Sequence, residues 1–203
     1  MKWTPIPEDA GKPLKRMIER ESTTEAATFP YYRKKYRGGP GGEEKKPPRY
    51  YDEAISEFKE GSSLWVFGAG HPVHCNLIRN LSNLGTILAT DLLEEAKKGL
   101  DKSIDFRVHD ILKEDVETFD YVFSSHTIEH FTRDQLMDIV LPKCLSRARE
   151  AVVFVAPYSD KKWADAKEHR VQLDEHDELA ARASRYKILN GIEIMLWFEG
   201  EAQ

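Results

Sequence analysis

The sequence has few cysteines and no long apolar run, and both absences narrow the class of protein. Its 203 residues include only Cys75 and Cys144, which lie far apart and have no metal-ligand partner at short spacing. We therefore expect two reduced thiols. No window approaches the roughly 20 apolar residues of a membrane-spanning helix, and the opening residues MKWTPIPEDAGK lack the apolar core of a secretory signal. The sequence predicts a cytoplasmic protein that does not bind membranes.

A large excess of positive charge is also absent. The net charge is −5, and residues 59–203 carry 18 Lys and Arg against 25 Asp and Glu. Such an acidic body argues against tight binding to duplex nucleic acid, which requires many neutralised phosphates. Residues 1–58 hold 12 basic and 10 acidic residues, and seven of the basic ones lie within residues 31–49. A local nucleic-acid contact through this basic segment stays open.

Residues 1–50 show no sustained hydrophobic period and are rich in proline, glycine and charge. We expect at most a short helix over residues 14–21, and we assign residues 1–50 to an N-terminal extension and residues 51–203 to the folded domain. The extension is either a flexible tail or an ordered arm that covers a substrate pocket. The second interpretation is favoured by its aromatic residues, Phe29, Tyr31, Tyr32 and Tyr36.

From Tyr51 onward, apolar runs typical of strands alternate with helical patterns. Strands are predicted over residues 64–68, 86–91, 104–110, 119–125 and 151–157, and helices near residues 50–60, 73–83, 92–100, 132–147 and 174–183. Two further strand-like runs flank Asn190-Gly191, a two-residue hairpin signal. This order predicts an α/β fold: a Rossmann-like, doubly wound and mostly parallel sheet with a C-terminal antiparallel hairpin.

Glycines and acids stand at the ends of successive predicted strands. Gly68-Ala69-Gly70 follows the first strand, Asp91 the second and Asp110 the third, and Ser124-Ser125-His126 follows the fourth. Ligands of open parallel sheets bind at these carboxyl ends. Each feature has an ordinary structural explanation, because glycines form tight turns and aspartates cap helices and turns. Their conjunction predicts a nucleotide site.

The third glycine of a dinucleotide-binding turn is missing, because Gly70 is followed by His71-Pro72. Pro72 suits a first helical turn but removes one amide that a pyrophosphate would need. A cofactor with adenosine and no phosphates requires fewer free amides from this turn. The sequence therefore favours S-adenosylmethionine over NAD.

The motifs VFGAG, ATD, VHD, FDYVFSSHTIEHF and VFVAPY resemble those of class I S-adenosylmethionine-dependent methyltransferases. They are most similar to the small-molecule group with an LEH-like motif after the fourth strand. The resemblance covers about residues 52–203 and implies a seven-stranded sheet. It also implies cofactor contacts from Phe67, Gly68, Ala69, Gly70, Asp91, Leu92, Asp110, Ile111, Ser125 and His126.

Within this resemblance, Asp91 would accept hydrogen bonds from the ribose hydroxyls, with Leu92 beside the adenine. Asp110 would accept one from the adenine amino group, and Ser125 and His126 would lie under the methionine arm. Pro72 departs from the family pattern and leaves the path of the methionine carboxylate open.

His130 is the first candidate for a catalytic base, because an imidazole has a pKa near neutrality and this one follows the pocket-forming strand. The alternative is that Glu129-His130 only caps and braces the following helix. The segment VAPY, which ends at Tyr158, resembles the NPPY element of methyltransferases that act on exocyclic amines. That element follows the fourth strand, whereas VAPY follows the fifth, so the resemblance disfavours methylation of a base exocyclic amine.

Two further groups of side chains have the composition of metal ligands, yet we expect no metal. The weak candidate set is His169, Asp174 and His176. The other set is expected to cap or pack the first helix of the sheet: His71, His74 and Cys75.

The sequence thus predicts a methyltransferase that uses S-adenosylmethionine on a small-molecule acceptor, with oxygen as the expected acceptor atom. One alternative is an RNA or protein methyltransferase that grips its polymer through residues 31–49. Another is a non-catalytic, nucleotide-binding partner subunit. The identity of the acceptor and the oligomeric state are left open.

Overall fold

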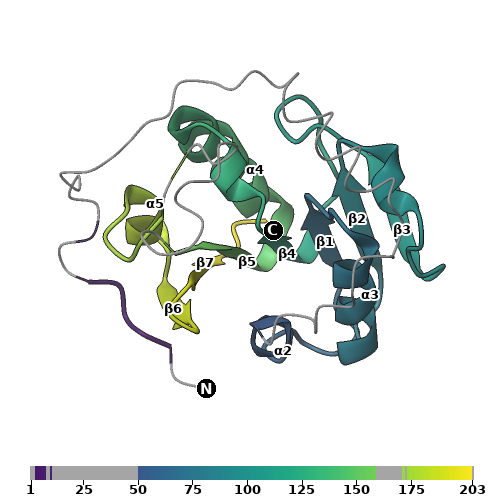
Figure 1. Cartoon of the computed structure of the whole chain (residues 1–203), viewed down its shortest axis with the longest axis horizontal. Helices are drawn as coiled ribbons and strands as arrows, with labels where there is room; N and C mark the ends of the chain where they lie inside the picture. Colours follow the sequence, from purple (N-terminus) through teal and green to yellow (C-terminus); the bar gives the residue numbers. More distant parts are fainter. Residues whose placement is uncertain (1–2, 8–9, 11–49, 159–170, 172, 203) are drawn as a thin grey trace.

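The computed structural model describes residues 3–7, 10, 50–158, 171 and 173–202 (Figure 1). The predicted helix over residues 14–21, the aromatic and basic residues of the extension, and His169 lie outside the described residues. What the sequence predicts for them stays a prediction.

Seven strands form one sheet in the order β3-β2-β1-β4-β5-β7-β6 (Figure 1). The strands are β1 (Leu64–Phe67), β2 (Ile87–Asp91), β3 (Ile104–Val108), β4 (Phe119–Ser125), β5 (Ala148–Pro157), β6 (Arg185–Leu189) and β7 (Glu193–Glu199). The first five strands pair in parallel, and β7 is antiparallel to both β5 and β6. The predicted fold class is confirmed.

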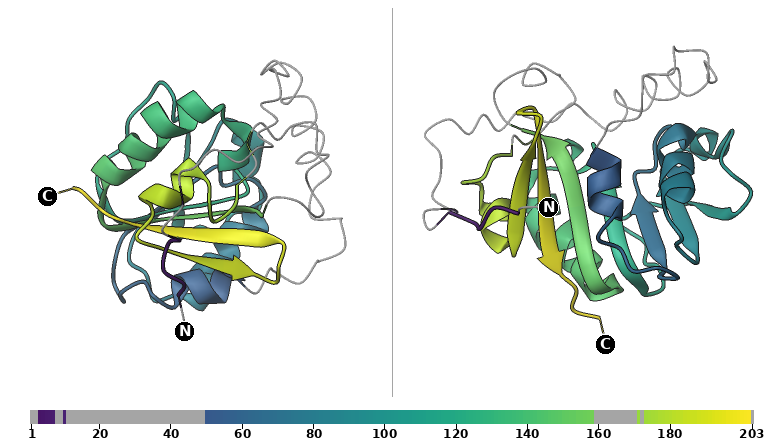
Figure 2. Two further views of the ribbon diagram at one scale, coloured as in Figure 1. Left: turned by 90° about the vertical axis from the view of Figure 1, so that its left-hand side faces the viewer. Right: turned by 90° about the horizontal axis from the view of Figure 1, so that it is seen from below.

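Helices cover both faces of the sheet, so β1 is apolar throughout and the polar residues of β4 and β5 lie near the strand ends. The helices α2 (Tyr50–Ile55) and α3 (Pro72–Leu81) pack on one face, and α4 (Leu141–Arg147) and α5 (Glu178–Arg182) pack on the other (Figure 2). Alternate side chains of β1 enter the two cores: Trp65 enters the core under α4 and Val66 the core under α3. Cys75 and Cys144 are both buried, unbonded and on opposite faces.

The segment predicted as a helix near residues 92–100 is only a 3₁₀ turn, η1 (Glu94–Lys97). Leu93 stays extended because its N–H donates to the Asp91 carboxylate, so helical dihedrals begin only at Glu94. Gly99, at φ 90°, then takes a left-handed conformation before β3. The extended Leu93 at one end and the left-handed Gly99 after the other end confine η1 to Glu94–Lys97.

The helix predicted near residues 132–147 is divided in two. Its first part is a π-helix, η3 (Gln135–Val140), and its second part is α4. Pro142, in the first turn of α4, has no N–H for a helical bond, and its ring crowds the carbonyl four residues before it. The π-helical turn of η3, which is wider than an α-helical turn, accommodates both the missing N–H and the ring of the proline.

The C-terminal hairpin forms at the predicted residues. Asn190 and Gly191 have φ values of 52° and 68°, the left-handed pair that a type I′ turn requires. The N–H of Ile192 donates to the carbonyl of Leu189 at 3.1 Å and closes the turn.

Residues near the N-terminus lie against β6, the last strand of the sheet. Thr4 and Tyr186 exchange two backbone hydrogen bonds, at 2.9 and 3.1 Å. The Arg185 guanidinium lies 4.3 Å from the ring centroid of Trp3 and 4.2 Å from that of Trp197. Part of the predicted extension therefore covers the open edge at β6.

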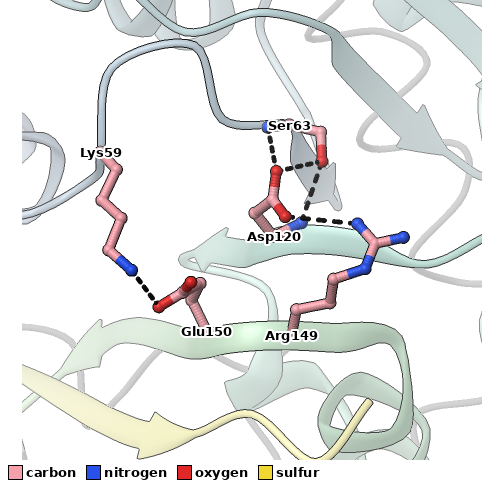
Figure 3. Close-up of polar contacts among 5 residues, drawn as sticks. All are labelled: Lys59, Ser63, Asp120, Arg149 and Glu150. Carbon is pink, nitrogen blue, oxygen red and sulfur yellow. Dashed lines mark hydrogen bonds and ion pairs between the residues drawn. The ribbon is translucent and has the colours of Figure 1, made fainter. Parts of the chain in front are cut away.

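A polar network joins β4, β5 and the segment before β1 at the amino-terminal edge of the sheet (Figure 3). The Asp120 carboxylate accepts hydrogen bonds from the N–H and hydroxyl of Ser63, at 2.7 and 2.8 Å, and from Arg149 at 3.2 Å. Lys59 pairs with Glu150 beside it at 2.7 Å. Partial burial would raise the pKa of Asp120, but the contacts with Ser63 and Arg149 outweigh it and lower that pKa.

Replacing Asp120 with alanine should lower the free energy of unfolding by about 1–3 kcal/mol, because it leaves the Ser63 amide without its acceptor. Urea denaturation at neutral pH measures this loss. The matched control is Asp115→Ala, which removes an exposed ion pair to Arg147 and should cost less than about 1 kcal/mol. Since the folded pKa of Asp120 is depressed, its contribution should vanish as the pH falls through that pKa. Equal losses in the two variants would contradict this assignment.

Candidate functional site

The turn after β1 has a backbone that only glycine adopts readily. Gly68 and Gly70 have φ values of 63° and 58°. Between them, the N–H of Ala69 donates to the carbonyl of Thr90 at 2.9 Å. The helix α3 follows, with Pro72 in its first turn and His71 as its N-cap, whose Nδ1 accepts the N–H of Val73 at 3.4 Å. The predicted glycine turn is present at the carboxyl end of β1.

The side chains expected to pack near this helix do so. His74 Nδ1 lies 2.8 Å from the hydroxyl of Tyr51, and Cys75 is fully buried. Within the part of the chain that the structure describes, no three or more His, Cys, Asp and Glu side chains are grouped to hold a metal ion.

Asp91 joins the end of β2 to the glycine turn. Its Oδ2 accepts the N–H of Gly70 and its Oδ1 accepts the N–H of Leu93, both at 2.9 Å. Burial raises the pKa of Asp91, and these backbone hydrogen bonds offset part of that rise. Each carboxylate oxygen has a second lone pair. The two roles considered for Asp91, capping and ligand binding, are therefore compatible.

An open groove lies beside Asp91 at the carboxyl ends of β2 and β3. Leu92 and Val108 each expose about half of their surface there, 49% and 50%. The groove is lined by Leu92, Leu93, Glu94, Glu95 and Val108. It offers the apolar surface of Leu92 and Val108, together with two glutamates, next to the partly buried Asp91 carboxylate.

Asp110 and Ile111 follow β3 in the next loop. Asp110 accepts the N–H of Leu112 at 3.1 Å, and its Oδ2 pairs with Lys113 Nζ at 2.9 Å. The side chain of Ile111 is 6% exposed and belongs to the core, while its carbonyl accepts a hydrogen bond from Lys143. The Phe67 ring likewise packs in the core. Of these, Asp110 presents a polar group to solvent, and Phe67 and Ile111 contribute packing.

The loop after β4 is bonded directly to the glycine turn. The Ser124 hydroxyl donates to the carbonyl of Phe67 at 3.1 Å, and the Thr127 hydroxyl donates to that of Gly68 at 3.2 Å. A Cβ added to Gly68 would lie 2.2 Å from Thr127 Oγ1. The loop and the turn thus fit together only with glycine at position 68.

His126 occupies the centre of that loop in a left-handed conformation, with φ 53°. Its Nε2 lies 3.2 Å from Glu193 Oε1, and its Nδ1 lies 3.7 Å from Glu129 Oε1. Burial disfavours the imidazolium, but the two glutamates outweigh it and raise the pKa of His126 to about 9. At neutral pH His126 is therefore charged.

His130 ends the 3₁₀ turn η2 (Ile128–His130) after this loop. Burial would raise the pKa of Glu129, but its hydrogen bond with His126 and the charges of His130 and His126 hold that pKa below its usual range. His130 therefore lies in the same neighbourhood as Glu129 and His126. This group lies 56 to 62 residues along the chain from the glycine turn and is brought to it by the pairing of β1 with β4.

The side chains after β5 lie on the α5 side of the site. Tyr158 forms a bridge to Leu173, and burial followed by the charge and hydrogen bond of Glu175 raises the pKa of its hydroxyl. Asp174 accepts the N–H of His176 at 2.9 Å.

Sequence reasoning missed Glu193, which interacts with His126 across 67 residues. The available signal was an acid within the apolar run IEIMLWF, in a strand predicted to lie in the sheet. It also missed the pairing of Thr127 with Gly68, which requires β1 and β4 to be neighbours.

No protein-family model matches the sequence, and no curated protein matches it. Solved structures do match. The N-methyltransferase NodS from Bradyrhizobium japonicum, in complex with S-adenosyl-L-homocysteine, aligns with a TM-score of 0.60 at 10% identity, over 83% of this chain and 98% of NodS. Magnesium protoporphyrin IX methyltransferase (ChlM) from Synechocystis PCC 6803, with bound SAM, aligns at 0.57 and 12% identity, over 75% and 79%. The fold is that of class I methyltransferases.

The mitomycin 7-O-methyltransferase MmcR shares this methyltransferase fold, with a TM-score of 0.59 at 12% identity over 74% of this chain. The chain spans about half the length of several structures that it matches, including 53% of MmcR. None of the helices in the described residues is long and apolar enough to cross a bilayer.

Replacing Gly68 with alanine should disrupt the junction of turn and loop. The variant combines left-handed strain with a collision against Thr127, and should lose about 3 kcal/mol or more of unfolding free energy. The control is Gly191→Ala, which has a similar φ of 68° and open space around it, and should lose only about 1–2 kcal/mol. Chemical denaturation of both variants gives the comparison. A Gly68 variant no less stable than the Gly191 variant would refute the packing argument.

Proposed function

We propose that this chain is a methyltransferase that uses S-adenosylmethionine to methylate a small molecule, with oxygen as the acceptor atom. One observation carries the proposal: the partly buried Asp91 carboxylate is bonded to the Gly70 amide and lies beside an open groove with an apolar surface from Leu92 and Val108. NodS and ChlM, which share the fold, were solved with S-adenosylhomocysteine and SAM. These likenesses support the proposal through the fold alone.

The residues present fit this cofactor. Asp91 has lone pairs for the two ribose hydroxyls, and Leu92 and Val108 offer apolar surface to an adenine ring. Asp110 is the acceptor proposed for the adenine amino group, in exchange for its exposed contact with Lys113. Ser125 and His126 follow β4 on the other side of the glycine turn. When bound, the cofactor would supply a methyl group already activated on sulfonium sulfur.

The first turn of α3 supports this cofactor over a dinucleotide. A pyrophosphate bound at a helix N-terminus needs free amides. Pro72 has no N–H, and the N–H of Val73 is directed to His71 Nδ1. Two of the amides that a pyrophosphate would use are therefore lost.

The chain's own contribution to catalysis would be to orient the acceptor and to remove its proton. His126 is a poor base at neutral pH because the pKa raised to about 9 keeps it protonated. His130, which follows it by one turn, remains the proposed base. The alternative of RNA or protein methylation depends on residues 31–49, which lie outside the described residues.

Titration calorimetry with S-adenosylhomocysteine, S-adenosylmethionine and NAD tests the cofactor. We expect both sulfur ligands to bind and NAD not to bind. Asp91→Asn should weaken binding about 10- to 100-fold, because the charged hydrogen bonds to the ribose are lost and one of the two amides that Asp91 accepts loses its partner. Asp105→Asn, at an exposed position near the start of β3, is the matched control and should leave affinity unchanged. The proposal would be contradicted if the wild-type protein bound neither sulfur ligand, or if Asp91→Asn bound them with unaltered affinity.

A further inference from the structure

Glu193 is a buried acid at the functional edge of the sheet. It is the first residue of β7, pairs in register with Pro157 at the end of β5, and is 8% exposed. The next five residues of the strand are apolar, Ile194 to Phe198. Burial of a carboxylate is unfavourable in free energy, so the contacts of Glu193 must stabilise it by more than its burial destabilises it.

Glu193 contacts His126, whose backbone is strained. A non-glycine residue at positive φ is uncommon and is held by its surroundings. Here the N–H of His126 donates to the carbonyl of Val155 at 2.9 Å, and both ring nitrogens are directed to carboxylates. The imidazole therefore links three separate elements: the loop after β4, η2 and β7.

The charges around His126 come from each of these elements. Glu193 faces it from β7 and Glu129 faces it from η2, where His130 also acts on Glu129. Glu129 is 2% exposed and Glu193 is 8% exposed, so both acids are shielded from water. Two buried carboxylates that share one imidazolium can fix its position far more tightly than exposed ion pairs do.

We propose that Glu193 is a positioning residue, which acts with Glu129 through His126 to hold the loop after β4 in the shape that receives the cofactor. The inference rests on the proposed function, because Ser125 and His126 are proposed cofactor contacts. The loop reaches the glycine turn through the hydrogen bond from Thr127 to Gly68. Displacing His126 therefore alters both walls of the site at once.

This arrangement makes cofactor binding depend on pH in one direction. The pKa of His126 is about 9, above the ordinary 6.5. The stabilisation of the loop after β4 by charged His126 is therefore complete below about pH 6.5 and is lost as the pH rises through about 9. Affinity for S-adenosylhomocysteine should fall over that interval.

The experiment compares Glu193→Gln with wild-type protein and with Glu199→Gln, the exposed glutamate at the other end of β7. Proton NMR follows the His126 ring, assigned with a His126→Asn variant, and calorimetry measures binding of S-adenosylhomocysteine from pH 6.5 to 10. Glu193→Gln should lower the His126 midpoint by about one pH unit or more. It should also weaken binding about fivefold or more at pH 8, whereas Glu199→Gln should change neither value.

His126→Asn serves as a second background, because asparagine accepts a left-handed backbone but carries no charge. In this background Glu193→Gln should have no further effect on affinity, since the partner is already gone. An equal loss in both backgrounds, or a Glu193→Gln variant with normal midpoint and affinity, would overturn the positioning role. Failure of every protein, wild type included, to bind the ligand would instead overturn the proposed function, and the positioning role with it.

Discussion

The carboxylate of Asp91 holds the ends of the first two strands together, and the site is organised around this contact. Its two oxygens accept amides from the glycine turn and from the residue that opens the groove, at 2.9 Å each. Without such donors, a carboxylate shielded from water would destabilise the fold. The raised pKa of Asp91 shows that burial still disfavours its charge, so a ligand that brings further hydroxyl donors would stabilise the charged form. Structure and proposed function therefore depend on the same atoms.

The loop after β4 forms the other wall by a similar principle. Hydroxyls of Ser124 and Thr127 bond to consecutive carbonyls of the turn region, and His126 is held between acids from η2 and β7. The switch point of the sheet, where β1 lies between β2 and β4, places these walls side by side. Polar contacts between elements that are distant in sequence thus set the shape of the site, while the two apolar cores hold the strands beneath it.

Local sequence patterns predicted what depends on local physics. The alternation of apolar runs indicated the order of strands, Asn190-Gly191 indicated the hairpin, and Gly68 and Gly70 indicated the left-handed turn. Features that depend on long-range contacts were not predictable. The helix after Asp91 begins only at Glu94, because the Asp91 carboxylate holds Leu93 in an extended conformation. Glu193 reaches His126 only because β7 inserts between β5 and β6. Ile111 likewise enters the core, which sequence position alone does not indicate.

The central claim is that the edge formed by the glycine turn, Asp91 and the loop after β4 receives S-adenosylmethionine. Hydrogen–deuterium exchange with and without S-adenosylhomocysteine tests it most directly, since bound ligand slows the opening of the amides it covers. We expect slower exchange at residues 68–70, 91–93 and 125–127, and unchanged exchange at the opposite edge around Ser63 and Arg149. Unchanged exchange in all three segments at saturating ligand, or protection confined to the opposite edge, would contradict it.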